Sequence, residues 1–155
     1  MSYADLLQIA YHEAGHAVIG RAHDPRIVRA TIVPDAGRRG HVEFDRVPTD
    51  AVAGLSVFLA GPMAEHYLRT RTFAGLNGRP SFDVHASDDW SRMLSYLPTA
   101  FHWRDNSTFC LAFERTAGLL IYHWDHVEAV ADALLTHKTI TGAYVTALLS
   151  KHEAA

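Results

Sequence analysis

The feature that most constrains this chain is the sequence His12-Glu13-Ala14-Gly15-His16, set inside an apolar run that predicts a helix. Residues four apart lie one turn apart on the same face of an α-helix, so both imidazoles can reach one metal ion. Glu13 lies roughly 100° round the helix from His12, where its carboxylate can touch a water on the metal without binding the metal. The spacing therefore predicts a metal site with His12 and His16 as ligands and Glu13 as a general base.

This set of residues is typical of zinc hydrolases. Zinc lowers the pKa of a bound water to about 7, so a neighbouring carboxylate can take its proton at neutral pH and later return it to a leaving amine. Gly15 and Ala14 are small, and we therefore expect another segment to approach this turn closely and complete the site. The alternative is a chance match, in which both histidines are ordinary polar positions on an amphipathic helix.

The residues around the motif resemble the zinc helix of the peptidase domain of FtsH-type AAA proteases. Residues Ile9–Gly20 read IAYHEAGHAVIG, which is close to the family's usual VAYHEAGHAVVG. Four further segments resemble family segments in the family's order: ATIVP at 30–34, LAGPMAE at 59–65, ASDDW at 86–90 and ALLTHKTITG at 133–142.

The resemblance implies a fold and a third ligand. It implies an α+β, mainly α-helical, zincin-like peptidase domain with a small antiparallel β-sheet, formed by residues 1–155 as a single zinc metallopeptidase domain. In the family an Asp completes the site of one zinc ion per chain, and that Asp corresponds to Asp89. From the residues alone, four side chains compete for this place: Asp83, His85, Asp88 and Asp89. Acidic residues in a first helical turn also stabilise the helix dipole without any metal.

Length and composition narrow the class of protein. A chain of 155 residues fits one domain with a sizeable core, and 48% hydrophobic with 20% charged residues is typical of soluble globular proteins. The net charge of -3 gives no basic surface for nucleic acid. Cys110 is the only cysteine, which excludes an internal disulfide and favours a reducing, cytoplasmic location. The longest apolar stretch, residues 51–64, is too short to span a bilayer, so we expect no membrane segment.

Residues 2–50 are expected to form one helix and two strands. Ser2 or Asp5 can cap a helix that runs to about His23, where Asp24-Pro25 stops it. β-branched and alternating residues predict antiparallel strands at 27–33 and 40–45, with turn residues between them. The edge of this pair could bind a polypeptide substrate as an added strand, or the pair could simply be scaffold.

Residues 51–71 are expected to form a helix broken at Gly61-Pro62, because a proline in a helix interior costs about 3 kcal/mol. Glu65 follows this break. The resemblance implies that it lies close to the zinc helix, where it could accept a hydrogen bond from a ligand imidazole. Alternatively, Glu65 is a surface residue near Arg69.

The rest of the chain alternates loop and helix. Gly and Pro residues predict a loop at 72–82, either a lid over the cleft or a surface excursion, and Ser87 predicts the start of a helix that ends at Pro98. From Asn106 onward the pattern is helical, with a break at Thr141-Gly142 before a short last helix. His123 and His126 are expected to be packing or surface residues rather than metal ligands.

The motif and the resemblance together predict a zinc-dependent metalloendopeptidase that hydrolyses unfolded or flexible polypeptides. Zinc is expected on His12, His16 and, as the resemblance implies, Asp89, with Glu13 as base. No GxxxxGK[ST] loop is present, so the ATPase module of the family is absent from this chain. The chain could form a homo-oligomer or act with a separate ATPase or adaptor partner. Two alternatives remain. One is a non-catalytic, zinc-stabilised module that binds a peptide or partner. The other is a regulatory protease of narrow specificity, of the phage-repressor-cleaving type.

Overall fold

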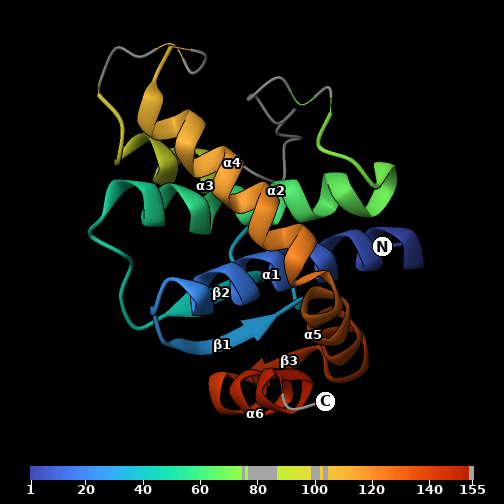
Figure 1. Ribbon diagram of the computed structural model, residues 1–155. Helices are drawn as coiled ribbons and strands as arrows, with labels where there is room; N and C mark the ends of the chain where they lie inside the picture. Colours follow the sequence, from blue (N-terminus) through green and yellow to red (C-terminus); the bar gives the residue numbers. More distant parts are fainter. Residues whose placement is uncertain (75, 77–86, 99–101, 103–104, 154–155) are drawn as a thin grey trace.

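The fold is mainly helical with one small sheet (Figure 1). It is seen in a computed structural model that describes residues 1–74, 76, 87–98, 102 and 105–153. Most of the predicted loop at 72–82 lies outside the described residues, as do Asp83 and His85. In chain order the elements are α1 (Tyr3–Ala22), β1 (Ile27–Thr31), β2 (His41–Phe44), α2 (Ala51–Thr70), α3 (Ser87–Leu94), α4 (Ser107–Tyr122), α5 (Trp124–His137), β3 (Thr139–Thr141) and α6 (Gly142–Glu153).

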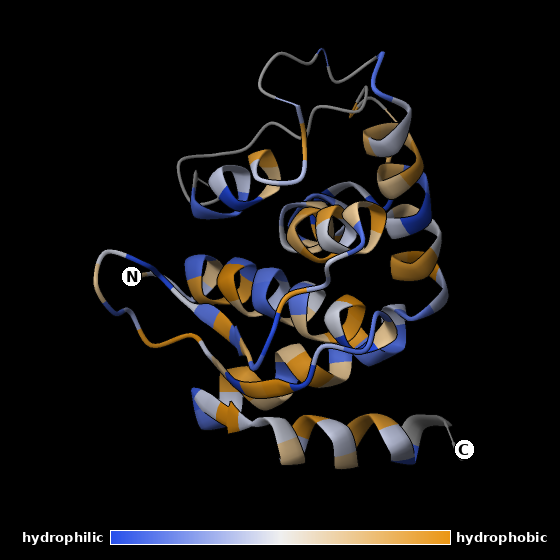
Figure 2. Ribbon diagram, turned by 90° about the vertical axis from the view of Figure 1, so that its left-hand side faces the viewer, coloured by the Kyte–Doolittle hydropathy of each residue, from blue (hydrophilic) through white to orange (hydrophobic). Residues whose placement is uncertain are grey.

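The elements form layers, with α1 lying between α2 and the sheet (Figure 1). The strand order is β2-β1-β3, and both pairs are antiparallel, as predicted for the first pair. Figure 2 shows the molecule from the side, with α6, the helix leading to the C-terminus, below the sheet. β2 is thus an edge strand, on the side of the sheet that faces the candidate site described below.

Helix α1 is the centre of the packing. Of the two predicted caps, Ser2 and Asp5, Ser2 is the N-cap: Asp5 N–H donates to Ser2 Oγ, while Ser2 N–H donates to Asp5 Oδ2. Every residue from Ile9 to Gly20 is buried, so this part of the helix has no solvated face. A polar side chain on a helix that is buried on every side loses its hydrogen bonds to water and needs a partner within the protein. The two buried histidines and the buried glutamate of α1 are therefore exceptional.

The predicted break at Gly61-Pro62 is wrong, because α2 runs without interruption from Ala51 to Thr70 with Pro62 inside it. The proline ring costs about 3 kcal/mol in a helix interior. However, residues 54–65 are all buried, and each fully buried Leu or Met contributes roughly 1.5–3 kcal/mol. Leu55, Leu59 and Met63 alone therefore outweigh the proline, and tertiary packing against α1 and α4 keeps the helix intact.

The C-terminal part is helical as expected, with Asn106 capping α4 through its side chain. Two features were not predicted. His123 alone separates α4 from α5, although no glycine or proline marks the boundary between residues 119 and 127. The three residues of β3 are too few to show alternation, yet they pair with β1. Among the described residues, no helix is both long enough and apolar enough to cross a membrane.

Candidate metal centre

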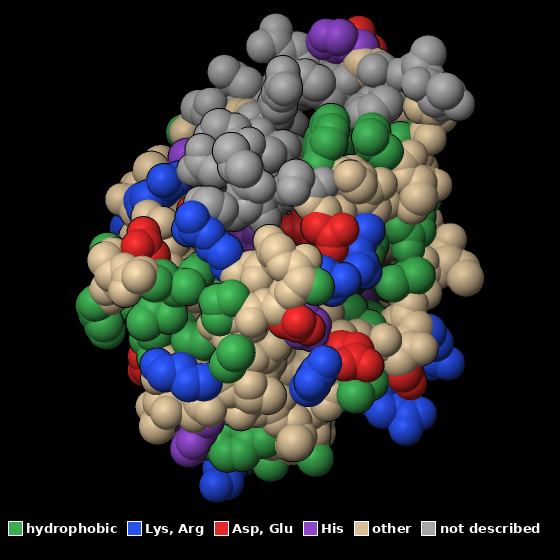
Figure 3. Space-filling view, turned by 180° about the vertical axis from the view of Figure 1, so that it is seen from behind, with side chains coloured by type: hydrophobic (Ala, Val, Ile, Leu, Met, Phe, Trp, Pro, Cys, Tyr) green, Lys and Arg blue, Asp and Glu red, His purple; other side chains and the backbone are tan. Residues whose placement is uncertain are grey.

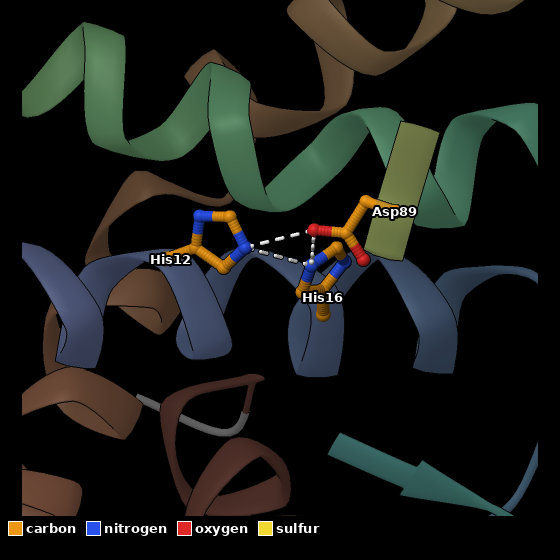
Figure 4. Close-up of side chains that lie close together, drawn as sticks. All are labelled: His12, His16 and Asp89. Carbon is orange, nitrogen blue, oxygen red and sulfur yellow. Dashed lines mark hydrogen bonds and ion pairs between the residues drawn. The ribbon is translucent and has the colours of Figure 1, made fainter. Parts of the chain in front are cut away.

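Three side chains from two distant elements meet at one point (Figure 4). His12 and His16 lie one turn apart on α1, and their Nε2 atoms are 3.2 Å apart. Asp89, on α3, places Oδ2 3.0 Å from Nε2 of His12 and 3.2 Å from Nε2 of His16. Both histidines are buried and the Asp89 side chain is only 16% exposed, so these polar atoms are largely removed from water.

The other nitrogen of each imidazole has an acceptor of its own. Nδ1 of His16 lies 2.7 Å from the carbonyl oxygen of Val57, which can only accept, so Nδ1 carries the hydrogen. Nδ1 of His12 lies 3.4 Å from Oε2 of Glu65, on the same face of α2. The predicted position of Glu65 near the helix is thus observed. With Nδ1 as the donor, Nε2 of each neutral ring offers a lone pair to the cluster.

Helix α2 can approach the histidines only because α1 and α2 carry glycines at the contact. A Cβ at Gly15 would lie 2.5 Å from the carbonyl oxygen of Ala60 and 2.7 Å from Cβ of Ala64. A Cβ at Gly61 would overlap Nε2 of His16 and lie 2.7 Å from Nε2 of His12. The close approach predicted for Gly15 is confirmed, and Gly61, expected to break the helix, instead leaves room for the cluster.

The cluster fits a metal ion. Two imidazole lone pairs and a carboxylate oxygen 3.0–3.2 Å apart repel one another unless a cation or proton lies among them. Ligand atoms at the corners of a tetrahedron with zinc bonds of about 2.0–2.1 Å would be separated by about 3.3 Å, close to the distances seen. Two imidazoles and one carboxylate are also a donor set that zinc uses in catalytic sites. These three residues could therefore hold zinc.

The protonation of the metal-free cluster leads to the same conclusion. Burial would lower the pKa of His12, but its contacts with Asp89 and Glu65 outweigh burial and raise the pKa to about 10. Burial likewise opposes the rise in the pKa of His16, which the charge of Asp89 produces. The same imidazoles hold the pKa of Asp89 below its usual range against the effect of burial. A positive charge is thus favoured at this point, and a proton or a metal ion can supply it.

Only one of the two adjacent aspartates on α3 faces the histidines. The Asp88 side chain is 55% exposed, and its Oδ2 lies 3.4 Å from Nε of Arg92 and 3.9 Å from Nε of Arg38. Asp89 lies roughly 100° further round this short helix and contacts both histidines. The alternative ligands Asp83 and His85 lie outside the described residues. His123 and His126 stack on each other, with ring centroids 5.0 Å apart.

Glu13 lies beside the cluster at the wall of a cleft of about 330 Å³. The cleft is lined by α1, by α3 and by the turn and strand at residues 37–44. Glu13 is 5% exposed, and a Cβ at Gly40 would lie 2.8 Å from its Oε1, so its carboxylate reaches the start of β2. Burial raises the pKa of Glu13 to about 7, with His12 and His16 acting in the opposite direction. Such a carboxyl group can exchange a proton near neutral pH.

Sequence reasoning missed two contributions to this site. The carbonyl of Val57 orients His16, but a backbone acceptor leaves no mark in the sequence. Gly61 was interpreted only as a helix breaker, because it precedes Pro62. Gly61 lies inside the long apolar stretch of α2. A glycine in such a stretch is the signal that could have indicated a close approach of another helix.

The chain is distantly similar to FtsH zinc metalloproteases. It is 23% identical to ATP-dependent zinc metalloprotease FtsH 3 of Symbiobacterium thermophilum over 92% of this chain and 29% of the relative. It is 38% identical to FtsH 1 of the same organism over 46% of this chain and 14% of the relative. It is 36% identical to FtsH of Syntrophus aciditrophicus over 54% of this chain and 10% of the relative.

The chain therefore spans less than a third of the length of these relatives. No protein-family model matches the chain. The similarity supports a relationship to zinc metalloproteases in general, and it leaves the activity of this chain to be argued from its own residues.

Proposed function

We propose that this chain is a zinc-dependent endopeptidase in which residues 1–155 act as a single metallopeptidase domain. His12, His16 and Asp89 would hold the ion. The observation that carries the proposal is the convergence of their three lone-pair atoms at 3.0–3.2 Å, with Glu13 buried beside them. The distant similarity to FtsH zinc metalloproteases supports the same choice of chemistry.

Bound zinc would supply Lewis acidity, lowering the pKa of a water and polarising the scissile carbonyl. Glu13, buried at the wall of the cleft next to the ligand His12, takes a proton from the attacking water and passes it to the nitrogen of the leaving amine. Glu65 and the carbonyl of Val57 hold the two imidazoles in the tautomer that presents Nε2 to the ion. The group that stabilises the developing oxyanion stays unassigned.

The substrate we propose is an extended segment of unfolded or flexible polypeptide. β2 is an edge strand and contributes His41, Val42 and Phe44 to the wall of the cleft. A segment added beside this edge would gain main-chain hydrogen bonds regardless of its sequence and would pass over Glu13. Folded substrates would have to be unfolded first, by a separate ATPase or adaptor partner.

The experiment combines metal analysis with cleavage of a permanently unfolded protein, using the wild type and Glu13→Gln. We expect about one zinc per chain in both proteins, because Gln keeps the size of Glu and the ligands are untouched. Cleavage by Glu13→Gln should fall roughly 100-fold or more, the effect typical of losing a positioned general base.

Two results would contradict the proposal in different ways. Unchanged cleavage by Glu13→Gln would show that another group takes the proton. Full zinc content with no cleavage by the wild type would favour a non-catalytic module that binds a peptide or partner.

A further inference from the structure

Beside the metal centre, a tight hairpin turn carries two arginines to the cleft. Asp35 and Arg38 exchange both backbone hydrogen bonds, with N···O distances of 3.0 and 2.9 Å. Between them Ala36 and Gly37 have φ of 48° and 84°, as a two-residue type I′ turn requires. This tight turn fixes the backbone from which Arg38 and Arg39 leave, and both residues line the cleft next to Glu13.

Among the described residues, the exposed charged ones that line the cleft are three arginines, Arg38, Arg39 and Arg92, and one acidic residue, Asp88. Arg38 and Arg92 share one carboxylate, that of Asp88, at 3.9 and 3.4 Å. Within the described part of the chain, Arg39 forms no ion pair. Hydrogen bonds from Ser2 lower the pKa of Asp5, and the nearby charge of Arg39 adds to this effect. In the face shown in Figure 3, Lys and Arg side chains lie next to acidic ones. Because the exposed lining holds three arginines and one acidic residue, the outer cleft keeps a surplus of positive charge even with Asp5 beside Arg39, although the chain as a whole carries -3.

From this arrangement we infer that the cleft selects polypeptides with a carboxylate close to the bond to be cut. The inference rests on the proposed function for the cleavage itself. The acidic groups Glu13, Asp89 and Glu65 lie deeper, at the metal centre, where they are largely buried and where bound zinc would offset part of their charge. A substrate carboxylate that enters the outer cleft therefore first meets Arg39 and the two arginines that share Asp88. Such a carboxylate can belong to an Asp or Glu side chain or to the C-terminus of the substrate.

The test measures binding separately from catalysis. Zinc-loaded Glu13→Gln protein is titrated with fluorescent, disordered, C-terminally amidated peptides that differ only in having Glu or Gln at alternate positions. A third peptide has the Gln sequence with a free C-terminal carboxylate. We expect the Glu peptide to bind about threefold or more tightly than the Gln peptide, the upper range for partly exposed ion pairs. The difference should disappear in about 1 M salt, where the Debye length is roughly 3 Å.

Variants in the Glu13→Gln background assign the effect to the turn. Arg39→Gln should remove most of the preference, and Arg38→Gln with Arg39→Gln should remove all of it. Arg46→Gln is the matched control, because Arg46 is exposed, pairs with Asp24 and lies outside the cleft lining, so its loss should leave the preference unchanged. Tighter binding of the third peptide than of its amidated form would identify the C-terminal carboxylate as the preferred source.

Equal binding of all three peptides, or no binding of any, would overturn the inference. So would a preference that survives in the double arginine variant. Cleavage by the wild type is measured in parallel. Equal rates of cleavage of the Glu and Gln peptides would overturn this inference alone. Charge-dependent binding without any cleavage would overturn the proposed function alone.

Discussion

At the scale of single residues, Asp88 and Asp89 are adjacent but lie in opposite environments. Asp89 contacts two buried imidazoles, and Asp88 contacts two partly exposed guanidinium groups. Both are in the first turn of α3, where either carboxylate can stabilise the helix dipole. Any difference between them in metal binding must therefore come from the side chain's position and not from helix stability.

We predict that Asp89→Asn lowers the zinc content well below one per chain, whereas Asp88→Asn leaves it unchanged. An amide is a much poorer zinc ligand than a carboxylate but has the same shape, so the fold should be kept in both. The measurement is zinc per chain after dialysis against a weak chelator, with circular dichroism as a check on the fold. Equal zinc content in the two variants would contradict the ligand role of Asp89.

At the scale of elements, the site depends on how closely α2 packs on α1. Gly61 has no room for a methyl group, because a Cβ there would overlap an imidazole of the cluster. Gly118, on α4, has nothing within 4 Å of the position of a Cβ. The same substitution in two helices therefore has opposite consequences.

Gly61→Ala should abolish zinc binding by forcing the imidazoles of His12 and His16 out of position. Gly118→Ala should keep zinc and stabilise the fold by up to about 1 kcal/mol, since alanine favours a helix interior over glycine. Zinc content and urea unfolding in the presence of EDTA measure the two effects separately. Full zinc content in Gly61→Ala would show that α1 and α2 can separate without disturbing the ligands.

At the scale of the whole molecule, the chain presents a cleft beside a strand edge, and its sequence contains no phosphate-binding GxxxxGK[ST] loop. A folded substrate exposes an extended segment only by opening, at a cost of up to its global stability of roughly 5–15 kcal/mol. At 5 kcal/mol the open fraction is about one in several thousand. Access to the cleft should therefore depend on how folded the substrate already is.

The 155-residue chain should cut a permanently unfolded protein and spare the same protein in its native form, and ATP should change neither rate. The substrate is one protein in two forms, native and unfolded by mutation, incubated with and without ATP. The fraction of intact substrate is followed over time. Equal cleavage of both forms, or stimulation by ATP, would contradict this expectation.

What the sequence determined by itself is the local structure and the spacing within it. The capped helix from Ser2 to about His23 was predicted because caps and apolar runs act over a few residues, and the four-residue spacing alone placed His12 and His16 on one face. The antiparallel strands and the start of a helical region at Asn106 were predictable for the same reason. From residue types alone, however, Asp89 could not be separated from Asp88, Asp83 and His85.

Only the tertiary structure decided which distant groups meet. Asp89 lies 77 residues from His12 along the chain, and no local pattern specifies that separation. The packing of α2 on α1 keeps the helix continuous through Pro62, turns Gly61 towards the cluster and brings the Val57 carbonyl to His16. These outcomes depend on burial summed over many residues, which is why local propensity predicted a break where packing maintains a helix.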